Sequence, residues 1–498
     1  MGIVIRQSFK TLIITYLGLI IGYVNTLFLY PLVLSEEQIG LIRLLISITF
    51  LFATFASLGA INIPAKFFPY FDNKMEKHRG FLFFLLMLGS FGFLIFSILF
   101  ISVKHLFFSI YSSNAKLLTD YYYFFIPFTL IVLYYSIMDS YLVIQKKPVV
   151  PNFVKEFLTR IMIASGMVLI WLKIFNFQDF VVFVISIYLL CLLVLLIYAE
   201  KLKVLFLRPN FLIFKSNYFK ELVIFGGFVL FGNASSLLIS NIDGLMVSAY
   251  KGLGATGIYT IAFFIATIIE IPKRSISQSV IPLVSEANKK EDIGQLNILY
   301  KKSSINQLII GGLIFIGIWS NIENIFHLMP NSSIYIQGKW VVFYIGISKL
   351  FDMATGINAE IVGTSKFYKL DLLFLILLGI VTVISNMIFI PIWGITGAAF
   401  ASAISVFSFN SMRFFFILKI FKIQPFTFNT IKVLVIGTVT LILNALLPAQ
   451  SNLYYDIMVR SLTIFIVYFS LVLLVKTSDD VNNIFSIIMK RIKSIFCR

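Results

Sequence analysis

Apolar stretches of about 20 residues, separated by short polar segments, repeat along the whole chain. A helix of about 20 residues crosses the hydrocarbon core of a bilayer, so each stretch predicts one membrane-spanning helix. Residues 372–412 carry no charge and are too many for one helix, and we expect Pro391-Ile392-Trp393-Gly394 to divide them. The pattern therefore predicts fourteen spans, at residues 11–33, 39–63, 80–103, 121–144, 152–172, 180–199, 221–248, 254–271, 303–325, 339–362, 370–390, 396–418, 430–447 and 457–475.

These spans predict an all-α polytopic integral membrane protein with two pseudo-symmetric six-helix lobes and two extra C-terminal helices. Between two of the spans we expect a Gly-rich loop at 252–257, and after them a long loop with a surface helix at 272–302. The expected parts are an N-terminal lobe (1–199), a cytoplasmic basic linker (200–220), a C-terminal lobe (221–420), helices 13 and 14 (421–476) and a cytoplasmic amphipathic tail (477–498).

The tail and the linker are the most basic of these parts. The linker carries Lys201, Lys203, Arg208, Lys215 and Lys220. On the tail, one helical face is apolar and the rest is basic, which is typical of a helix lying on an anionic membrane surface. The apolar face is formed by Ile484, Ile487, Ile488 and Ile492, and the charge by Lys490, Arg491, Lys493 and Arg498.

The composition agrees with a membrane protein. Hydrophobic residues make up 59% of the chain and charged residues 12%, and the mean hydropathy is +0.97. A soluble domain carries about 25% charged residues, so this chain cannot build a solvated surface.

The net charge of +18 comes mainly from alternate loops, which excludes a nucleic-acid surface and indicates the positive-inside rule. If the N-terminus is cytoplasmic, most of the basic residues lie in loops on the cytoplasmic side of the membrane. Arg43 and Lys349 lie within spans and so belong to neither side. The basic residues of the outer side are then Lys104, Lys116, Lys173, Lys251, Lys339 and Arg460. Both termini are therefore predicted to be cytoplasmic.

Signals for an enzyme are thin. The three histidines, His78, His105 and His327, are scattered over separate loops, and the two cysteines, Cys191 and Cys497, form no pattern. The chain has neither a P-loop nor an Asp-x-Asp motif. We expect no catalytic residue, no metal site and no cofactor.

Two segments of the chain are similar to each other. Gly40 lies 24 residues before Pro64, and Gly257 lies 25 residues before Pro282. Both segments then reach an Asn-Lys pair, at Asn73-Lys74 and at Asn288-Lys289. An internal duplication in a membrane protein is typical of a two-lobed transporter whose substrate path lies between the lobes.

Polar residues follow one face of the first and the seventh span, which would be counterparts in a duplicated chain. Such stripes indicate either the lining of a water-filled cleft or close packing of small residues between helices. The stripe of the first span is Thr11, Thr15, Gly18, Gly22 and Asn25, and that of the seventh is Asn233, Ser236, Ser240 and Asp243.

Charged residues inside spans are the other candidates for a site. Arg43 has no partner nearby in the sequence, so it either reaches the outer interface or presents its charge to an anionic substrate. Lys349 and Asp352 are three residues apart and form either an ion pair or part of a cavity. Asp139 could pair with any of these basic groups. Arg274 lies next to Lys273 at the cytoplasmic end of the span 254–271. It either sets the membrane topology as a positive-inside residue or binds a phosphate.

Several passages resemble the polysaccharide flippases (Wzx type) of the multidrug/oligosaccharidyl-lipid/polysaccharide (MOP) exporter superfamily, which includes the MATE transporters. The passages are Asp243 with Gly254-Ala255-Thr256-Gly257-Ile258-Tyr259 and Ile281-Pro282-Leu283-Val284-Ser285-Glu286, then Leu34-Ser35-Glu36-Glu37-Gln38-Ile39-Gly40-Leu41, then Trp393-Gly394-Ile395-Thr396-Gly397-Ala398-Ala399. The span count and the duplication agree with this resemblance over nearly the whole chain.

The resemblance implies two six-helix lobes around a V-shaped cleft. It implies alternating access, in which an isoprenoid-pyrophosphate-linked oligosaccharide moves from the inner to the outer leaflet of a bacterial inner membrane. That oligosaccharide would be a repeat unit of O-antigen, capsule or exopolysaccharide, and a polymerase and glycosyltransferases of the same pathway would be partners. The cavity candidates are then Arg43, Lys349, Asn25, Asn233, Ser236, Ser240 and Arg274.

Other functions stay open. If transport is coupled to H⁺ or Na⁺, the candidate carboxylates are Asp243, Asp139 and Asp352. The same carboxylates would suit a cation-coupled multidrug exporter, and another lipid is also a possible substrate. A membrane glycan ligase or polymerase predicts a long outer loop, which is absent, whereas a scaffold without transport is not excluded.

Overall fold

The computed structural model describes residues 2–73, 77–111, 115–145, 147–207, 209, 218–483 and 485–487, and helices are the regular elements of these residues. Ten of the helices are long and apolar enough to cross a membrane. The chain forms two compact units, Met1–Thr260 and Ile261–Arg498. The chain is thus an all-α polytopic membrane protein. Most of the predicted tail, together with Arg208 and Lys215 of the linker, lies outside the described residues.

In the first unit, α3 packs against α5 and α8, and α11 packs against α8 and α10. Two single π-helical turns, Asn25–Leu29 and Val154–Leu158, interrupt otherwise regular helices. The helices are α1 (Gly2–Val24), α2 (Tyr30–Val33), α3 (Glu36–Ala56), α4 (Ile63–Phe71), α5 (Phe81–Ser102), α6 (Lys104–Tyr111), α7 (Lys116–Asp120), α8 (Phe125–Ile144), α9 (Val149–Phe153), α10 (Thr159–Trp171), α11 (Phe177–Lys201) and most of α12 (Phe219–Thr267).

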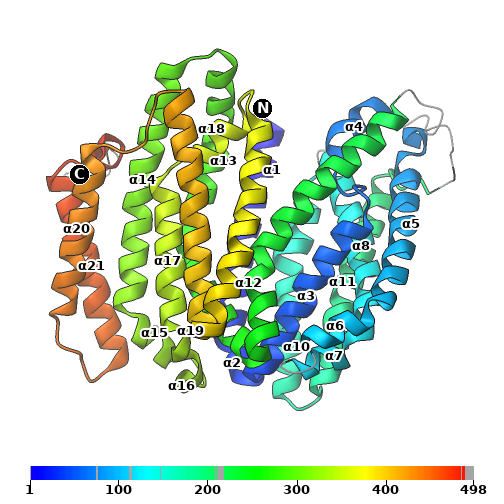
Figure 1. Ribbon diagram of the computed structural model, residues 1–498, viewed down its shortest axis with the longest axis horizontal. Coiled ribbons are helices and arrows are strands. Elements are labelled where there is room, and N and C mark those ends of the chain that lie inside the picture. The colour runs from blue at the N-terminus through cyan, green and yellow to red at the C-terminus, as the bar shows by residue number, and fades with distance from the viewer. Residues whose placement is uncertain are drawn as a thin grey trace, which may run out of the picture. The chain divides into compact units, whose positions relative to one another are not determined.

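In the second unit, α14 packs against α17, and α19 covers the other side of α17 (Figure 1). The hairpin of α20 and α21 packs against α14 through a core that includes Ile309, Val433 and Tyr468. The helices are α13 (Ile271–Lys289), α14 (Ile293–Ser320), α15 (Ile322–Leu328), α16 (Ser332–Tyr335), α17 (Lys339–Ala354), α18 (Asn358–Gly363), α19 (Tyr368–Ile420), α20 (Phe428–Ala445) and α21 (Leu453–Leu474).

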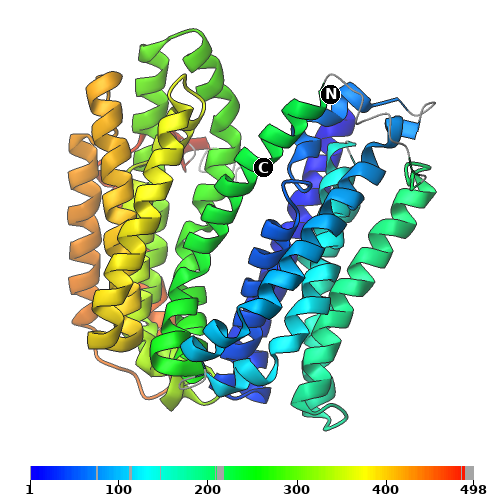
Figure 2. The ribbon, with the colours of Figure 1, turned by 45° about the vertical axis from the view of Figure 1, so that its right-hand side comes forward.

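Helix α19 contains 53 residues and folds back on itself, as Figures 1 and 2 show in yellow to orange. Its only non-helical backbone is at Gly394, where φ is +59°. The guanidinium of Arg413 donates two hydrogen bonds to the carboxylate of Asp371, at 2.8 and 2.9 Å. These residues could not meet along a straight helix that rises about 1.5 Å per residue. The predicted break at Pro391-Ile392-Trp393-Gly394 is therefore confirmed.

Helix α12 contains 49 residues and also turns back at one glycine, Gly252, where φ is +88°. The hydroxyl of Tyr259 donates a hydrogen bond to Oδ2 of Asp243 at 2.9 Å, across the turn. The expected Gly-rich loop at 252–257 is wrong, because the helix resumes directly after Gly252. A single residue with positive φ is enough to reverse the chain.

Of the long loop with a surface helix that was expected at 272–302, the helix is present as α13, but the long loop is wrong. Helix α13 continues from the eighth span through the 3₁₀ turn Ile268–Glu270, and α14 begins at Ile293. The polar residues of this region lie on exposed faces of two helices joined by a short turn. Polarity alone does not separate such an amphipathic helix from a loop.

The ion pair between Arg413 and Asp371 should be essential for the stability of the second unit. Arg413 is 9% exposed, and its guanidinium also lies 4.0 Å from the ring centre of Phe409. Removing one partner of a buried pair costs about 3–5 kcal/mol, so Arg413→Ala should lower the unfolding temperature of the purified protein. The double variant Asp371→Leu/Arg413→Met leaves no unpaired charge and should recover most of the loss. An Arg413→Ala protein as stable as the parent would contradict this role.

Candidate functional site

Arg43 lies on α3 among buried apolar residues, yet its own side chain is exposed. Its Nη2 donates a hydrogen bond to Oδ1 of Asn241 on α12 at 3.3 Å. Tyr30, Tyr188 and Tyr259 lie close enough to interact with its charge electrostatically. The guanidinium is therefore held by its hydrogen bond to a neutral amide of α12, and it retains donors for a ligand.

Asp243 lies two residues after Asn241 and is 9% exposed. The hydrogen bond from Tyr259 fixes one of its oxygens. We call Arg43, Asn241, Asp243 and Tyr259 the Arg43 cluster. Sequence reasoning named Arg43 and Asp243 separately but could not pair them, because the fold-back at Gly252 and the contact of α3 with α12 bring them together.

The other polar residues of the seventh span lie along the exposed side of α12. Asn233, Ser236 and Ser240 are exposed, and Nδ2 of Asn233 donates to Oδ1 of Asn62 at 2.7 Å. Ser240 donates to the carbonyl of Leu237 within its own helix. Their assignment to a substrate cavity stays a prediction.

The polar stripe of the first span packs against α9 and α10. Nδ2 of Asn152 donates to Thr15, and Nδ2 of Asn25 donates to the carbonyl of Arg160 at 2.8 Å. A Cβ on Gly18 would lie 2.1 Å from the carbonyl oxygen of Glu156, so only glycine fits there. Asn25 is 4% exposed. This geometry matches the alternative that the sequence left open, in which small residues let two helices pack closely.

Asp139 is half-buried on α8. It lies within electrostatic reach of Lys155 and Glu156, on the π-helical turn Val154–Leu158. Glu156 itself pairs with Arg160 at 2.8 Å. Asp139 thus belongs to a different group of charges from the Arg43 cluster, although both groups lie in the first unit.

Five charged residues form a network in the second unit. Glu270 accepts from Lys349 and lies 3.5 Å from Arg274, whereas Asp352 pairs with Lys273 at 2.6 Å. Side-chain exposure is 20% for Glu270, 22% for Lys349 and 65% for Arg274. We call these residues the charge network. It carries one more positive than negative charge, and the guanidinium of Arg274 is its most accessible part.

The sequence left open whether Lys349 and Asp352 form an ion pair or part of a cavity, and in the structure Lys349 pairs with Glu270 and Asp352 with Lys273. The two residues are neighbours on α17, but each pairs with a residue at the end of the eighth span. Residues three apart on a helix can contact each other. Here the partners are instead Glu270 and Lys273, from the turn Ile268–Glu270 and the start of α13. The sequence signal that was missed is Glu270, which stands three and four residues before the basic pair Lys273-Arg274.

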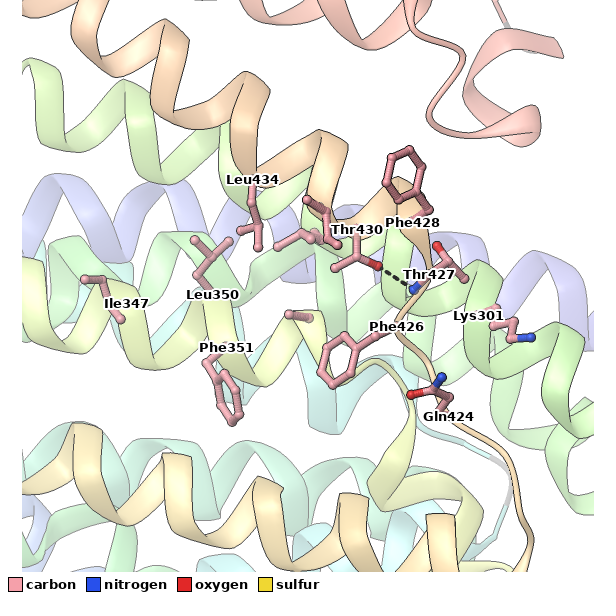
Figure 3. Close-up of a pocket in the computed structure, with 13 residues that line it drawn as sticks. Lys301, Ile347, Leu350, Phe351, Gln424, Phe426, Thr427, Phe428, Thr430 and Leu434 are labelled. Atoms are coloured by element: carbon pink, nitrogen blue, oxygen red, sulfur yellow. Dashed lines mark hydrogen bonds between the residues drawn. The ribbon is translucent and has the colours of Figure 1, made fainter.

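An apolar groove of about 890 Å³ opens beside α17, whose Ile347, Leu350 and Phe351 line one wall (Figure 3). Helix α20 and the segment before it form the other wall. Figure 3 shows Ile347 at one end of the groove and Lys301 with Gln424 at the other. The lining residues are Lys301, Leu308, Ile347, Leu350, Phe351, Ala354, Gln424, Phe426, Thr427, Phe428, Thr430, Ile431 and Leu434. No pattern of residues along the chain indicated this groove, because a groove depends on how helices pack.

No cluster of metal-binding side chains occurs among the residues that the structure describes. The charged side chains of the two sites are paired with each other or with polar neighbours.

The fold and part of the sequence are similar to those of known proteins. Residues 4–288 match the model of a family described as polysaccharide biosynthesis protein. An uncharacterized membrane protein of Methanocaldococcus jannaschii is 26% identical over 289 residues, which are 55% of each chain, so the chain spans about half the length of this curated relative.

Solved structures extend the similarity of fold to nearly the whole chain. The lipid II flippase MurJ, in an inward closed conformation, superposes with a TM-score of 0.75 at 15% identity, covering 93% of this chain and 97% of MurJ. An inward-facing MATE family transporter of the MOP superfamily superposes with a TM-score of 0.62 at 12% identity, covering 81% of this chain and 94% of the transporter. A MOP superfamily transporter from Pyrococcus furiosus superposes with a TM-score of 0.54 at 12% identity, covering 84% of this chain and 95% of that transporter.

Proposed function

The chain belongs to the polysaccharide biosynthesis protein family and has a MOP superfamily fold, and on this premise we propose that it moves an isoprenoid-pyrophosphate-linked oligosaccharide from the inner to the outer leaflet. The glycan is a repeat unit of a surface polysaccharide such as O-antigen, capsule or exopolysaccharide. The membrane is a bacterial inner membrane with both termini of the chain cytoplasmic. The pathway's polymerase and glycosyltransferases are its partners.

The observation that carries this proposal is the apolar groove with Lys301 at one end. Lipid tails are as apolar as the lining of this groove, so an isoprenoid chain gains there through close van der Waals contacts rather than by leaving water. Lys301 lies about two turns into α14, just before the predicted span 303–325, where in the proposed orientation the pyrophosphate of such a lipid reaches the cytoplasmic interface. A soluble drug needs no such groove, whereas a lipid-linked substrate does.

We propose that the chain crosses the membrane fourteen times. The ten candidate helices include α12 with its continuation to Lys289, and α19, and each of these turns back once and so crosses twice. Two further crossings are the interrupted helix of residues 149–171 and α17 with α18. The expected lobes 1–199 and 221–420 then each contain six.

The charged groups lower the barrier for the pyrophosphate. A charge without a partner in hydrocarbon costs many kcal/mol, so a hydrated path needs basic groups along it. In the proposal, Arg274 receives the phosphates at the inner side, and Lys349 and Arg43 bind them deeper in the protein. Asn233, Ser236 and Ser240 line the path. If transport is coupled to H⁺ or Na⁺, Asp243, Asp139 and Asp352 are the carboxylates to test.

Leaflet exchange in proteoliposomes tests the function. A fluorescent isoprenoid-pyrophosphate oligosaccharide is reconstituted with the protein, and a membrane-impermeant quencher is added outside. The assay is run with and without an imposed ion gradient. We expect the quenched fraction of the fluorescence to exceed the half that lies in the outer leaflet. Quenching that stays at half under both conditions contradicts the flippase. Efflux of cationic drugs in the same vesicles would then favour the multidrug exporter, whose fold this chain shares.

Filling the groove should slow exchange without unfolding the protein. Leu434 is 51% exposed and lines the groove, so Leu434→Trp adds bulk where the lipid chain is proposed to lie. We expect the exchange rate to fall about tenfold, the equivalent of about 1.4 kcal/mol. Val435→Trp, on the same helix and outside the groove, is the matched control. Equal rates for both variants would remove the groove from the transport path.

A further inference from the structure

A second pocket lies at the other end of α14 from Lys301. Its volume is about 480 Å³, within the range of about 300–1,000 Å³ that small-molecule sites occupy. It is formed by the end of α14, by α15, by the first residue of α17 and by the ends of the α20–α21 hairpin. Because α14 is long enough to cross the bilayer, this pocket and the groove mouth near Lys301 face opposite sides of the membrane.

The polar wall of the pocket is held rigidly. Nε of Arg460 donates to Oδ2 of Asp456 at 2.7 Å, and its other nitrogens reach the carbonyls of Asn444 and Leu447. Nδ2 of Asn324 donates to the same oxygen of Asp456 at 2.6 Å. These bonds join α15 to the α20–α21 hairpin, so the wall is preorganised and binding would not have to order it.

The opposite side of the pocket offers an aromatic ring and an accessible carboxylate. Trp319 lies at the end of α14, with its ring centre 4.7 Å from that of Phe343. Nζ of Lys339 lies 2.6 Å from Oε1 of Glu323, whose side chain is 63% exposed. The hydrogen bond and the charge of Lys339 lower the pKa of the Glu323 carboxyl, so it is ionised at neutral pH and accepts hydrogen bonds.

The charges in the pocket balance. Glu323 is paired with Lys339 and Asp456 with Arg460, in contrast to the charge network, which has an excess positive charge. A phosphate would meet two carboxylates here. A neutral ligand rich in hydroxyl groups would find donors, acceptors and an aromatic ring in one concave site.

From this arrangement we propose that the pocket binds the neutral sugar residues of the translocated glycan at the outer face of the membrane. The assignment rests on the proposed function and orientation, in which Lys339 and Arg460 lie on the outer side. Trp319 packs against the face of a sugar ring, and Glu323 and Asn324 bind its hydroxyls. The site holds the glycan after the phosphates have crossed and so opposes its return.

Cysteine protection in cells tests the pocket with the natural substrate. Ser320 lines the pocket, and Ser320→Cys is introduced after Cys191 and Cys497 have been replaced by Ser. The rate of labelling by a membrane-impermeant maleimide is compared between cells that make the lipid-linked glycan and cells lacking the first glycosyltransferase. We expect labelling to be at least threefold slower when the glycan is made. Lys116→Cys, exposed on the predicted outer side and remote in sequence from the pocket, should react equally in both.

Two further variants separate binding from folding. Trp319→Ala should remove the protection, whereas Trp171→Ala, which loses a 64%-exposed Trp elsewhere, should keep it. Should Trp319→Ala fail to fold, Glu323→Gln preserves the shape of the pocket and should at least halve the protection. Equal labelling in the two strains, or protection that survives both pocket variants, overturns the inference. Leaflet exchange in proteoliposomes is measured independently, so a flippase without this sugar site is distinguished from a protein that is no flippase.

Discussion

Replacing both Arg43 and Lys349 with Ala is expected to reduce flipping of the lipid-linked oligosaccharide by about ten- to a hundredfold. Each side chain supplies a charge-assisted hydrogen bond inside an apolar span, and a bond of this kind contributes about 1.5–3 kcal/mol. The lower value already corresponds to tenfold. Arg43 should account for most of the effect, because it is exposed and its protein partner is a neutral amide, whereas Lys349 is paired with Glu270.

The measurement is the initial rate of leaflet exchange, with drug efflux measured beside it. Drug efflux should not change, because cationic drugs do not bind to basic groups. Lys369→Ala removes an exposed lysine that lies outside the predicted spans, just before the span 370–390, and is the matched control. Arg43→Lys keeps the charge but loses the planar fork of donors, and should recover part of the rate if a phosphate is bound. Undiminished glycan export in the double Ala variant rules out these residues as the phosphate site.

Lys349→Ala also leaves Glu270 with a more distant partner, Arg274 at 3.5 Å. A loss of stability would therefore accompany it. The double variant Glu270→Gln/Lys349→Ala has no such unpaired carboxylate. If it folds as well as the parent and still flips slowly, the loss belongs to the missing ammonium rather than to an unfolded protein.

The second large effect is expected from Gly257→Ala. A Cβ on Gly257 would lie 2.0 Å from the carbonyl oxygen of Glu36, and a Cβ on Gly40 would lie 2.1 Å from that of Leu253. Both obstacles are backbone atoms at the start of α3 and after the turn of α12, and neither can rotate away. Even one methyl group forces the helices apart, which should cost about 1–3 kcal/mol.

Thermal unfolding of the purified protein measures this cost. Gly227→Ala is the matched control, since it lies in the same helix and its Cβ would meet nothing within 4 Å. It should be neutral or slightly stabilising, because alanine favours a helix more than glycine does. The double variant Gly40→Ala/Gly257→Ala should lose less than the sum of the single losses, because one separation of the helices relieves both clashes. A Gly257→Ala protein as stable as Gly227→Ala would show that α3 and α12 do not pack this closely.

The same two glycines were the matching positions of the internal repeat. The sequence showed that Gly40 and Gly257 occupy corresponding places in two similar segments, and it indicated a duplicated transporter from that. The structure adds that these glycines lie at one helix crossing, each facing the backbone of the other segment. A repeat reveals which residues correspond, and only packing shows that they meet.

The sequence by itself determined the apolar spans, the all-helical class, the reversal at Gly394 and the superfamily, because these follow from local hydrophobicity, from backbone freedom at glycine and from recognisable motifs. It also determined that Arg43, Asp243 and Lys349 are exceptional, since charge in an apolar stretch is visible without coordinates. Only the tertiary structure decided that Lys349 pairs with Glu270, that the stripe of the first span packs against α10, and that Asn241 reaches Arg43 across 198 positions. The groove beside α17 and the pocket at Trp319 arise in the same way, where three or more helices meet. Contacts of this kind join residues that are far apart in the sequence. They depend on how separate helices pack, and the pattern of residues along one helix does not contain that information.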